Sequence, residues 1–257
     1  MNRTTFFCCR QCLLLLLLCA LPTSHARAEE IRVAVASNFR QAFSAAALRF
    51  EEQSGHDVTL IAGSTGKHYA QILNGAPFDA FFAADAARPL RLESERRIVP
   101  GSRFTYAIGK LVLWSADQSL VDAGGKVLQS GPYRHLAIAN PELAPYGVAA
   151  RQVLQTLGLW DGLRDKLVRG ENIGQAFQFV VTGNAELGFV ARSQLEIPGH
   201  EFSGSAWEPP QALYDPIAQQ AVLLRDSRAG RGFMAFMRGK EARALIRAYG
   251  YDVPDVQ

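Results

Sequence analysis

Cysteine is nearly absent from this 257-residue sequence, and it is confined to the start of the chain. All four cysteines, Cys8, Cys9, Cys12 and Cys19, precede residue 20. The chain beyond them holds no thiol. Disulfide bonds, thiolate metal sites and cysteine nucleophiles are therefore excluded for residues 29–257.

The apolar run at residues 13–21 is too short to cross a membrane, because it has about half of the roughly 20 residues that a spanning helix needs. Arg3 and Arg10 make the segment before it positive, and Ala26-Arg27-Ala28 after it has the A-x-A form of a cleavage site. These three parts are typical of a secretory signal. We predict a signal peptide over residues 1–28.

Removal of this signal would leave a mature chain that begins near Glu29 and is exported. A lipoprotein anchored at Cys19 is the alternative, but Leu18 is a poor fit in front of a lipidated cysteine.

Excess charge of one sign is also missing from the exported part. The whole chain has a formal net charge of +3, and residues 1–28 carry three arginines and no acidic residue. The remainder is therefore close to neutral. Neither a nucleic acid nor a membrane surface is indicated as a partner.

No repeat, low-complexity segment or long linker interrupts the rest of the chain, and short apolar strands alternate with amphipathic helices. This alternation is typical of the α/β class. An apolar strand over 31–36 is followed by a helix over 39–50 that ends before Gly55. Further strands are predicted at 58–62, 78–84, 135–139 and 187–190, and further helices at 68–73, 148–157, 173–181 and 241–249.

Two apolar stretches, residues 106–114 and 217–224, are long enough to pass between two lobes as paired connectors. Two crossings would make the first lobe discontinuous. We predict a first lobe of residues 29–107 plus 217–257 and a second lobe of residues 108–216.

The stretch AGSTGKHYAQI, residues 62–72, resembles a phosphate-binding loop only in part. A Walker A loop needs G-x-x-x-x-G-K-[ST], and Gly66 and Lys67 fit this pattern. Ile61 stands where the first glycine belongs, and His68 stands where the magnesium-binding hydroxyl belongs. A nucleotide site is therefore not supported, but a turn that exposes N–H groups at a helix start remains.

Four predicted strand-to-helix turns carry small or polar residues: Ser37-Asn38, Gly63-Ser64-Thr65, Tyr146-Gly147 and Asn172-Ile173. Taken singly, each is an ordinary helix cap. Ligands of open α/β sheets, however, bind at the carboxyl ends of strands, where such turns lie. Helix starts offer unpaired N–H groups and a partial positive charge, so two turns from each lobe could surround a small anion.

The segments VAVASNF, AGSTGKHYAQILNGAPFDAFFAAD, ANPELAPYGVAARQVL and GENIGQAFQFVVTGNAELGFV resemble the periplasmic molybdate-binding proteins of ABC importers. The similarity extends to the tail KEARALIRAYGY. It implies a two-lobed periplasmic-binding-protein fold of type II, each lobe a mixed sheet flanked by helices, with the ligand in the cleft between the lobes. It also implies a monomer that is not an enzyme, needs no cofactor or metal ion, and delivers molybdate or tungstate to a membrane permease and its ATPase.

Carried over turn by turn, the resemblance implies oxyanion contacts from Ser37, Asn38, Ser64, Tyr146 and Ile173, the last two through backbone N–H groups. Many members of the family place a ligand-binding tyrosine after the late GFV-like strand, where this chain has Ala191. Tyr146 and Asn38 are expected to compensate. Apart from Lys67, these turns hold no cation, so the anion would be bound by neutral dipoles.

Three alternatives are considered. An exported hydrolase could use Ser64 with His68 as base and Asp79 or Asp85 to orient it, although the G-x-S-x-G elbow is missing. A binding protein of the same kind could take sulfate, chromate or a small carboxylate instead, because fold does not fix ligand.

The third alternative, a metal site, is not supported, because His68, His135 and His200 lack the H-x-x-x-H or H-E-x-x-H spacing.

Overall fold

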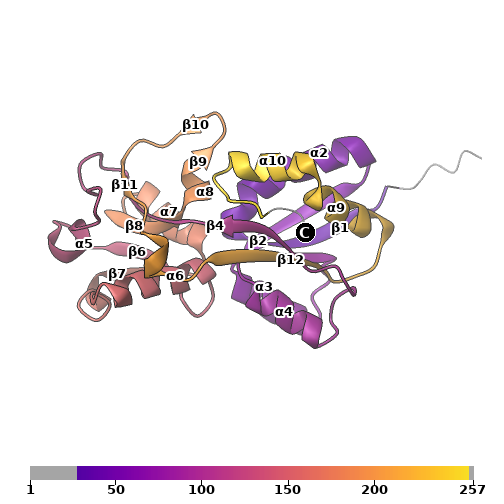
Figure 1. Ribbon diagram of the computed structural model, residues 1–257, viewed down its shortest axis with the longest axis horizontal. Helices are drawn as coiled ribbons and strands as arrows, with labels where there is room; N and C mark the ends of the chain where they lie inside the picture. Colours follow the sequence, from indigo (N-terminus) through magenta and orange to yellow (C-terminus); the bar gives the residue numbers. More distant parts are fainter. Residues whose placement is uncertain (1–27, 255–257) are drawn as a thin grey trace, which may run out of the picture.

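Two five-stranded sheets organise residues 28–254, the part of the chain that the computed structural model describes (Figure 1). The first sheet contains, in spatial order, β2 (Asp57–Gly63), β1 (Glu30–Ala36), β3 (Ala80–Ala83), β12 (Ile217–Leu223) and β4 (Phe104–Gly109). The second contains β11 (Ser205–Trp207), β5 (Leu111–Ser115), β8 (Leu187–Ala191), β6 (Leu136–Ala139) and β7 (Leu167–Gly170). Each sheet mixes parallel and antiparallel neighbours.

Each sheet and its helices form one lobe, called here the first and the second lobe. The first lobe has η2 (Ser37–Phe39), α2 (Arg40–Ser54), α3 (Thr65–Leu73), α4 (Ala87–Ser94), α9 (Arg228–Arg238) and α10 (Lys240–Ala248). The second lobe has α5 (Val127–Ser130), α6 (Pro145–Thr156), η3 (Arg164–Lys166), α7 (Ile173–Val181), α8 (Arg192–Leu195) and η4 (Gln211–Leu213), with a small ladder of β9 (Glu196–Ile197) and β10 (His200–Glu201). The predicted two-lobed α/β fold is confirmed.

Both faces of the first sheet are covered, as Figure 1 shows, with α2, α9 and α10 on one side and α3 and α4 on the other. On the α2 side, Phe43, Phe82 and Phe233 pack edge to face, with ring centroids 5.3 to 5.9 Å apart. Such aromatic pairs add stability beyond the apolar area that they bury. β1 pairs with β3, the strand that carries Phe82, and leads into the first of the four polar turns.

Each of the four predicted polar turns follows a strand of one of the two sheets. In the first lobe β1 pairs in parallel with β2, and in the second lobe β6 pairs in parallel with β7. Parallel neighbours end at the same edge of a sheet, so the turns after these four strands lie in two pairs, one pair in each lobe.

The connectors differ from the prediction. Residues 106–114 are not one strand: β4 ends at Gly109 in the first sheet, and β5 begins at Leu111 in the second. β4 thus runs past the predicted lobe boundary at 107. β12 lies wholly in the first sheet, between β3 and β4, and the return crossing uses the residues before Ile217. A run of apolar residues shows that a segment is buried, but not where it changes sheets.

Several other element bounds shift. α3 begins at Thr65 and not at His68, because Ser64 caps it. α6 begins at Pro145, where proline suits the first turn of a helix. The sequence analysis missed α4, α5, α8, β7 and the short strands β9 to β11, which have few residues, and it also missed α9, an amphipathic helix of 11 residues.

The predicted signal peptide lies outside the described residues, apart from Ala28. Within residues 28–254 no helix combines the length and the apolar character that a membrane crossing requires.

Candidate functional site

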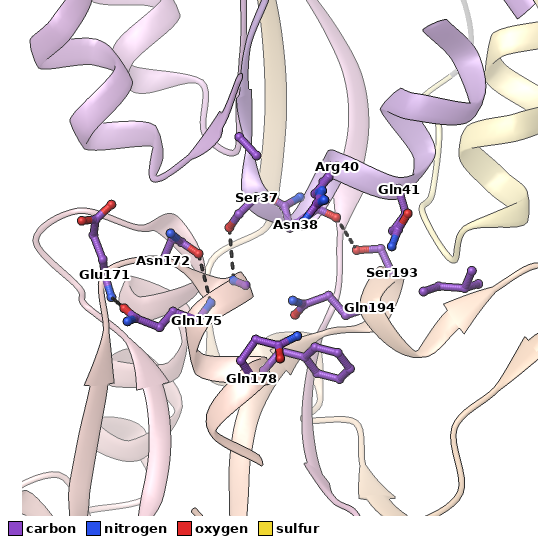
Figure 2. Close-up of a pocket in the computed structure, with 14 residues that line it drawn as sticks. Ser37, Asn38, Arg40, Gln41, Glu171, Asn172, Gln175, Gln178, Ser193 and Gln194 are labelled. Atoms are coloured by element: carbon purple, nitrogen blue, oxygen red, sulfur yellow. Dashed lines mark hydrogen bonds between the residues drawn. The ribbon is translucent and has the colours of Figure 1, made fainter. Parts of the chain in front are cut away.

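The four turns meet at the interface between the lobes, and hydrogen bonds cross it directly. The backbone N–H of Gly174, at the start of α7, donates to Ser37 Oγ over 3.2 Å. Ser193 Oγ donates to the Asn38 carbonyl over 3.1 Å, and both contacts are visible in Figure 2. The N–H of Gly66, in α3, donates to the Leu143 carbonyl over 2.8 Å. The structure therefore has the lobes in contact around the turns.

The helix starts at this interface fall into two kinds. Ser64 Oγ accepts from the N–H of Lys67 and caps α3, and Asn172 Oδ1 accepts from the N–H of Gln175 and caps α7. Ala36 and Ala144, which precede η2 and α6, provide no side-chain cap. The first N–H groups of a helix lack partners inside the helix. Those of η2 and α6 are thus suited to a bound anion.

Asn38 is buried, with 3% of its surface exposed, and its side-chain amide bonds to residues of the first lobe. Its Nδ2 donates to Gln219 Oε1 over 2.8 Å and to the Tyr251 hydroxyl over 2.9 Å. Both hydrogens of the amide are used by these two bonds. An oxyanion contact from Asn38 would therefore come from its backbone N–H.

Tyr146 extends from the second lobe into the first. It is 1% exposed, and its hydroxyl accepts a hydrogen bond from Gln219 Nε2 over 3.1 Å. Burial raises the pKa of Tyr146 well above its ordinary value, so the hydroxyl stays neutral. The side chain thus joins the lobes, and its backbone N–H lies in the uncapped first turn of α6.

Ile173, the first residue of α7, is held by a glutamine that the sequence analysis missed. Gln194 Nε2 donates to the Ile173 carbonyl over 3.2 Å, and Gln194 Oε1 accepts from the N–H of Ala191 over 2.9 Å. Gln194 thus ties the α7 start to Ala191 at the end of β8. No sequence signal marked Gln194, because its partners become neighbours only in the fold.

A cleft of about 550 Å³ opens beside this interface, lined by polar side chains from both lobes (Figure 2). Of the five predicted site residues, Ser37 and Asn38 line it. Ser64, Tyr146 and Ile173 do not, and each is at most 2% exposed. The structure brings all five to the same interface, and of the four turns the first turn and Asn172 of the fourth line the cleft.

Two cations at the interface, Lys67 and Arg88, are paired with acidic residues, whereas Arg40, the first residue of α2, lines the cleft. Lys67 Nζ lies 3.2 Å from Glu171 across the lobes, and Arg88 forms an ion pair with Asp85. In the part of the chain that the structure describes, no hydrogen bond of the five predicted residues involves a lysine or arginine side chain. The groups that donate to these five residues are amides and hydroxyls.

The hydrolase alternative is not supported by the geometry. His68 Nδ1 lies 3.1 Å from Gln71 Oε1 and not beside an acidic residue. The Asp79 carboxylate accepts from the N–H of Arg32, and Asp85 accepts from the N–H of Arg88. A catalytic triad requires an acid that orients the histidine, and neither aspartate does so here.

Within residues 28–254 no group of three or more acidic residues and histidines is arranged to hold a metal ion.

Comparison with known proteins identifies the relatives of this arrangement. The model of the bacterial extracellular solute-binding protein family matches residues 31–252. The molybdate-binding protein ModA of Azotobacter vinelandii is 51% identical over 229 residues, which cover 88% of this chain and 91% of that protein. ModA of Rhodobacter capsulatus is 48% identical over 229 residues, with 88% and 89% covered.

A solved structure, the periplasmic molybdate-binding protein of Azotobacter vinelandii, superposes with a TM-score of 0.85 at 46% sequence identity. The superposition covers 88% of this chain and all of that one.

Proposed function

The chain belongs to the bacterial extracellular solute-binding proteins, and on that premise we propose that it captures molybdate between its lobes and delivers it to an ABC importer. The ligand would be a tetrahedral oxyanion, with tungstate bound comparably. The protein would act as a monomer in the periplasm, after loss of residues 1–28, and its partners would be a membrane permease and the ATPase of that permease.

One observation carries the proposal: helix starts from opposite lobes face each other within hydrogen-bond distance, and in the described part of the chain no lysine or arginine side chain bonds to the five predicted residues. Gly174 N–H reaches Ser37 Oγ over 3.2 Å. Such N–H groups carry a partial positive charge and favour an anion. Hydrogen bonds to a charged group are worth about 1.5 to 3 kcal/mol each, so several together can hold an oxyanion.

The five residues would divide the contacts between the lobes. Ser37 and Ser64 would donate hydroxyl and backbone bonds from the first lobe, and Asn38 would donate its backbone N–H. Tyr146 and Ile173 would donate backbone N–H groups from the second lobe. The uncapped helix starts behind Ala36 and Ala144 support this division.

A site made mainly of hydrogen-bond donors would discriminate among oxyanions by the protonation state and the size of the anion. Phosphate keeps a proton near neutral pH and needs an acceptor, whereas the backbone N–H groups that would make most of these contacts can only donate. Sulfate has shorter bonds than molybdate and would leave buried donors unpaired, at a cost of about 1 to 3 kcal/mol each. Tungstate is close to molybdate in size and would satisfy the same donors.

Binding would be coupled to closure of the lobes. A ligand that contacts both lobes stabilises the closed state by its higher affinity for that state. The importer would then recognise the closed shape.

Isothermal titration calorimetry of the processed chain with molybdate, tungstate, sulfate and phosphate tests this proposal. We expect tight binding of molybdate and tungstate and binding at least a hundredfold weaker of sulfate and phosphate. If sulfate or phosphate bound as tightly as molybdate, the chain would be a binding protein for another oxyanion.

A further inference from the structure

Gln219 is the most completely buried polar side chain next to the site, and its exposed fraction is 0%. It lies on β12 of the first lobe. Its Oε1 accepts from Asn38 Nδ2 over 2.8 Å and from the Tyr106 hydroxyl over 2.9 Å. Its Nε2 donates to the Tyr146 hydroxyl over 3.1 Å. A single amide thus joins the Asn38 turn of one lobe to the Tyr146 turn of the other.

The backbone around Gln219 favours this bridge. The pairing of β12 with β4 shifts register between Gln219 and Gln220. Irregularities of this kind redirect side chains and occur next to functional sites. In line with this, the Gln220 side chain bonds elsewhere: its Nε2 donates to Thr105 Oγ1 over 3.1 Å, and its Oε1 accepts from Arg103.

Gly109 leaves room for the contact between the lobes. A Cβ atom at this position would lie 2.1 Å from the Tyr146 hydroxyl and 2.5 Å from Gln219 Nε2. Contacts this short do not occur, so any side chain here would displace the bridge. Residue 109 ends β4, directly before the chain crosses to the second sheet.

We propose that Gln219 is a positioning residue: it fixes the distance between the donor groups of the two lobes and thereby sets which oxyanion size they fit. The proposal rests on the proposed function, and it assigns Gln219 no contact with the ligand. A buried amide that satisfies its partners holds them in one geometry, whereas an apolar residue of similar length fills the space without directing them.

The test compares Gln219→Met, Tyr146→Phe and the double variant, with Gln220→Met as the matched control. The control removes a glutamine from the same strand that does not bond to the site. Calorimetry gives the ratio of sulfate to molybdate dissociation constants for each protein, and circular dichroism and thermal melting report the fold.

We expect Gln219→Met to lower the sulfate to molybdate ratio at least tenfold and Tyr146→Phe to lower it about threefold. The double variant should have the same ratio as Gln219→Met, because each change removes the hydrogen bond between Gln219 and the Tyr146 hydroxyl. Gln220→Met should stay within twofold of the wild type. If Gln219 only stabilised the fold, Gln219→Met would lower the melting temperature and leave the ratio of dissociation constants unchanged. That result would overturn the proposal.

Two further readouts keep the proposal falsifiable. If Gln219→Met does not fold, Tyr146→Phe decides the question, and an unchanged ratio in that variant overturns the proposal.

If the wild type binds no molybdate, the proposed function fails, and small-angle X-ray scattering without ligand then tests the bridge. Gln219→Met and Tyr146→Phe should show a larger radius of gyration than the wild type and Gln220→Met, and equal radii would refute the bridge.

Discussion

Ser37 Oγ in the first lobe accepts a hydrogen bond from the backbone N–H of Gly174 in the second, over 3.2 Å. The absence of a side chain at Gly174 permits this approach, because a Cβ atom there would lie 3.3 Å from Ser37 Cβ. The serine hydroxyl therefore sits where donors of both lobes converge.

Replacing this hydroxyl should weaken ligand binding and little else. We expect Ser37→Ala to weaken molybdate binding about ten- to hundredfold, because one bond to a charged ligand, worth about 1.5 to 3 kcal/mol, is lost. Calorimetry measures the change. Ser44→Ala, on the exposed face of α2, is the control and should bind like the wild type. Equal affinities of the two variants would remove Ser37 from the site.

The charge of Lys67 should matter little. Its ion pair with Glu171 is exposed, with 55% and 41% of the two side chains accessible. Exposed pairs contribute about 0.2 to 1 kcal/mol. We expect Lys67→Gln to change molybdate affinity less than threefold in calorimetry at low salt, and less at high salt. A loss beyond tenfold would mean that a cation holds the anion, contrary to the proposed site.

A methyl group at residue 109 should disturb closure. In Gly109→Ala the new atom would lie 2.1 Å from the Tyr146 hydroxyl, so the tyrosine must move out of the first lobe. Overpacking of this kind costs about 1 to 3 kcal/mol, and we expect molybdate affinity to fall at least tenfold. Gly162→Ala is the control, since its nearest neighbour would be 3.9 Å away. A Gly109→Ala protein with wild-type affinity would contradict the closed geometry.

Stability should fall in mild acid because of His68. This residue is 2% exposed and packs edge-on against Phe78, and burial lowers its pKa below the ordinary value of 6.5. The unfolded chain then binds more protons than the folded chain as the pH falls through and below 6.5. The stabilisation from neutral His68 is therefore complete above pH 6.5 and is lost on acidification.

Urea unfolding at pH 7.5 and pH 5 measures this effect in the wild type and in His68→Gln. The difference between the two proteins isolates His68 from the other titrating groups. We expect the wild type to lose more stability than the variant between the two pH values. Equal losses of stability in the wild type and in His68→Gln would show that His68 does not cause the pH dependence.

Much of the fold could be predicted from local patterns. The run IRVAVA followed by helical spacing up to Gly55 gave β1 and α2, and Gly55 ends the helix with a φ of 68°. The connectors could not be predicted in detail. Residues 106–114 are apolar on both sides of Gly109 and Lys110, and this short polar break does not by itself show that the chain changes sheets at Lys110.

Part of the candidate site could likewise be predicted from local sequence signals, and part of it could not. Ser64 and Asn172 could be found because a polar residue before a helix is a local signal, and both cap helices in the structure. Gln219 carried a weak signal, as a polar residue in an apolar strand. Its role could not be inferred, because Asn38, Tyr106 and Tyr146 are distant in sequence and become its neighbours only in the fold.

The central position of β12 has a consequence for the order of folding. β12 joins β3 to β4, and its pairing partners lie more than a hundred residues earlier in the chain. While only the first 216 residues have emerged, β3 has an open edge and β4 lacks its ladder partner. The second sheet, built from residues 111–207 alone, needs no later segment. Since contacts between distant segments form slowly, the half made from one continuous segment should mature first, and the half that contains the amino terminus should be completed last.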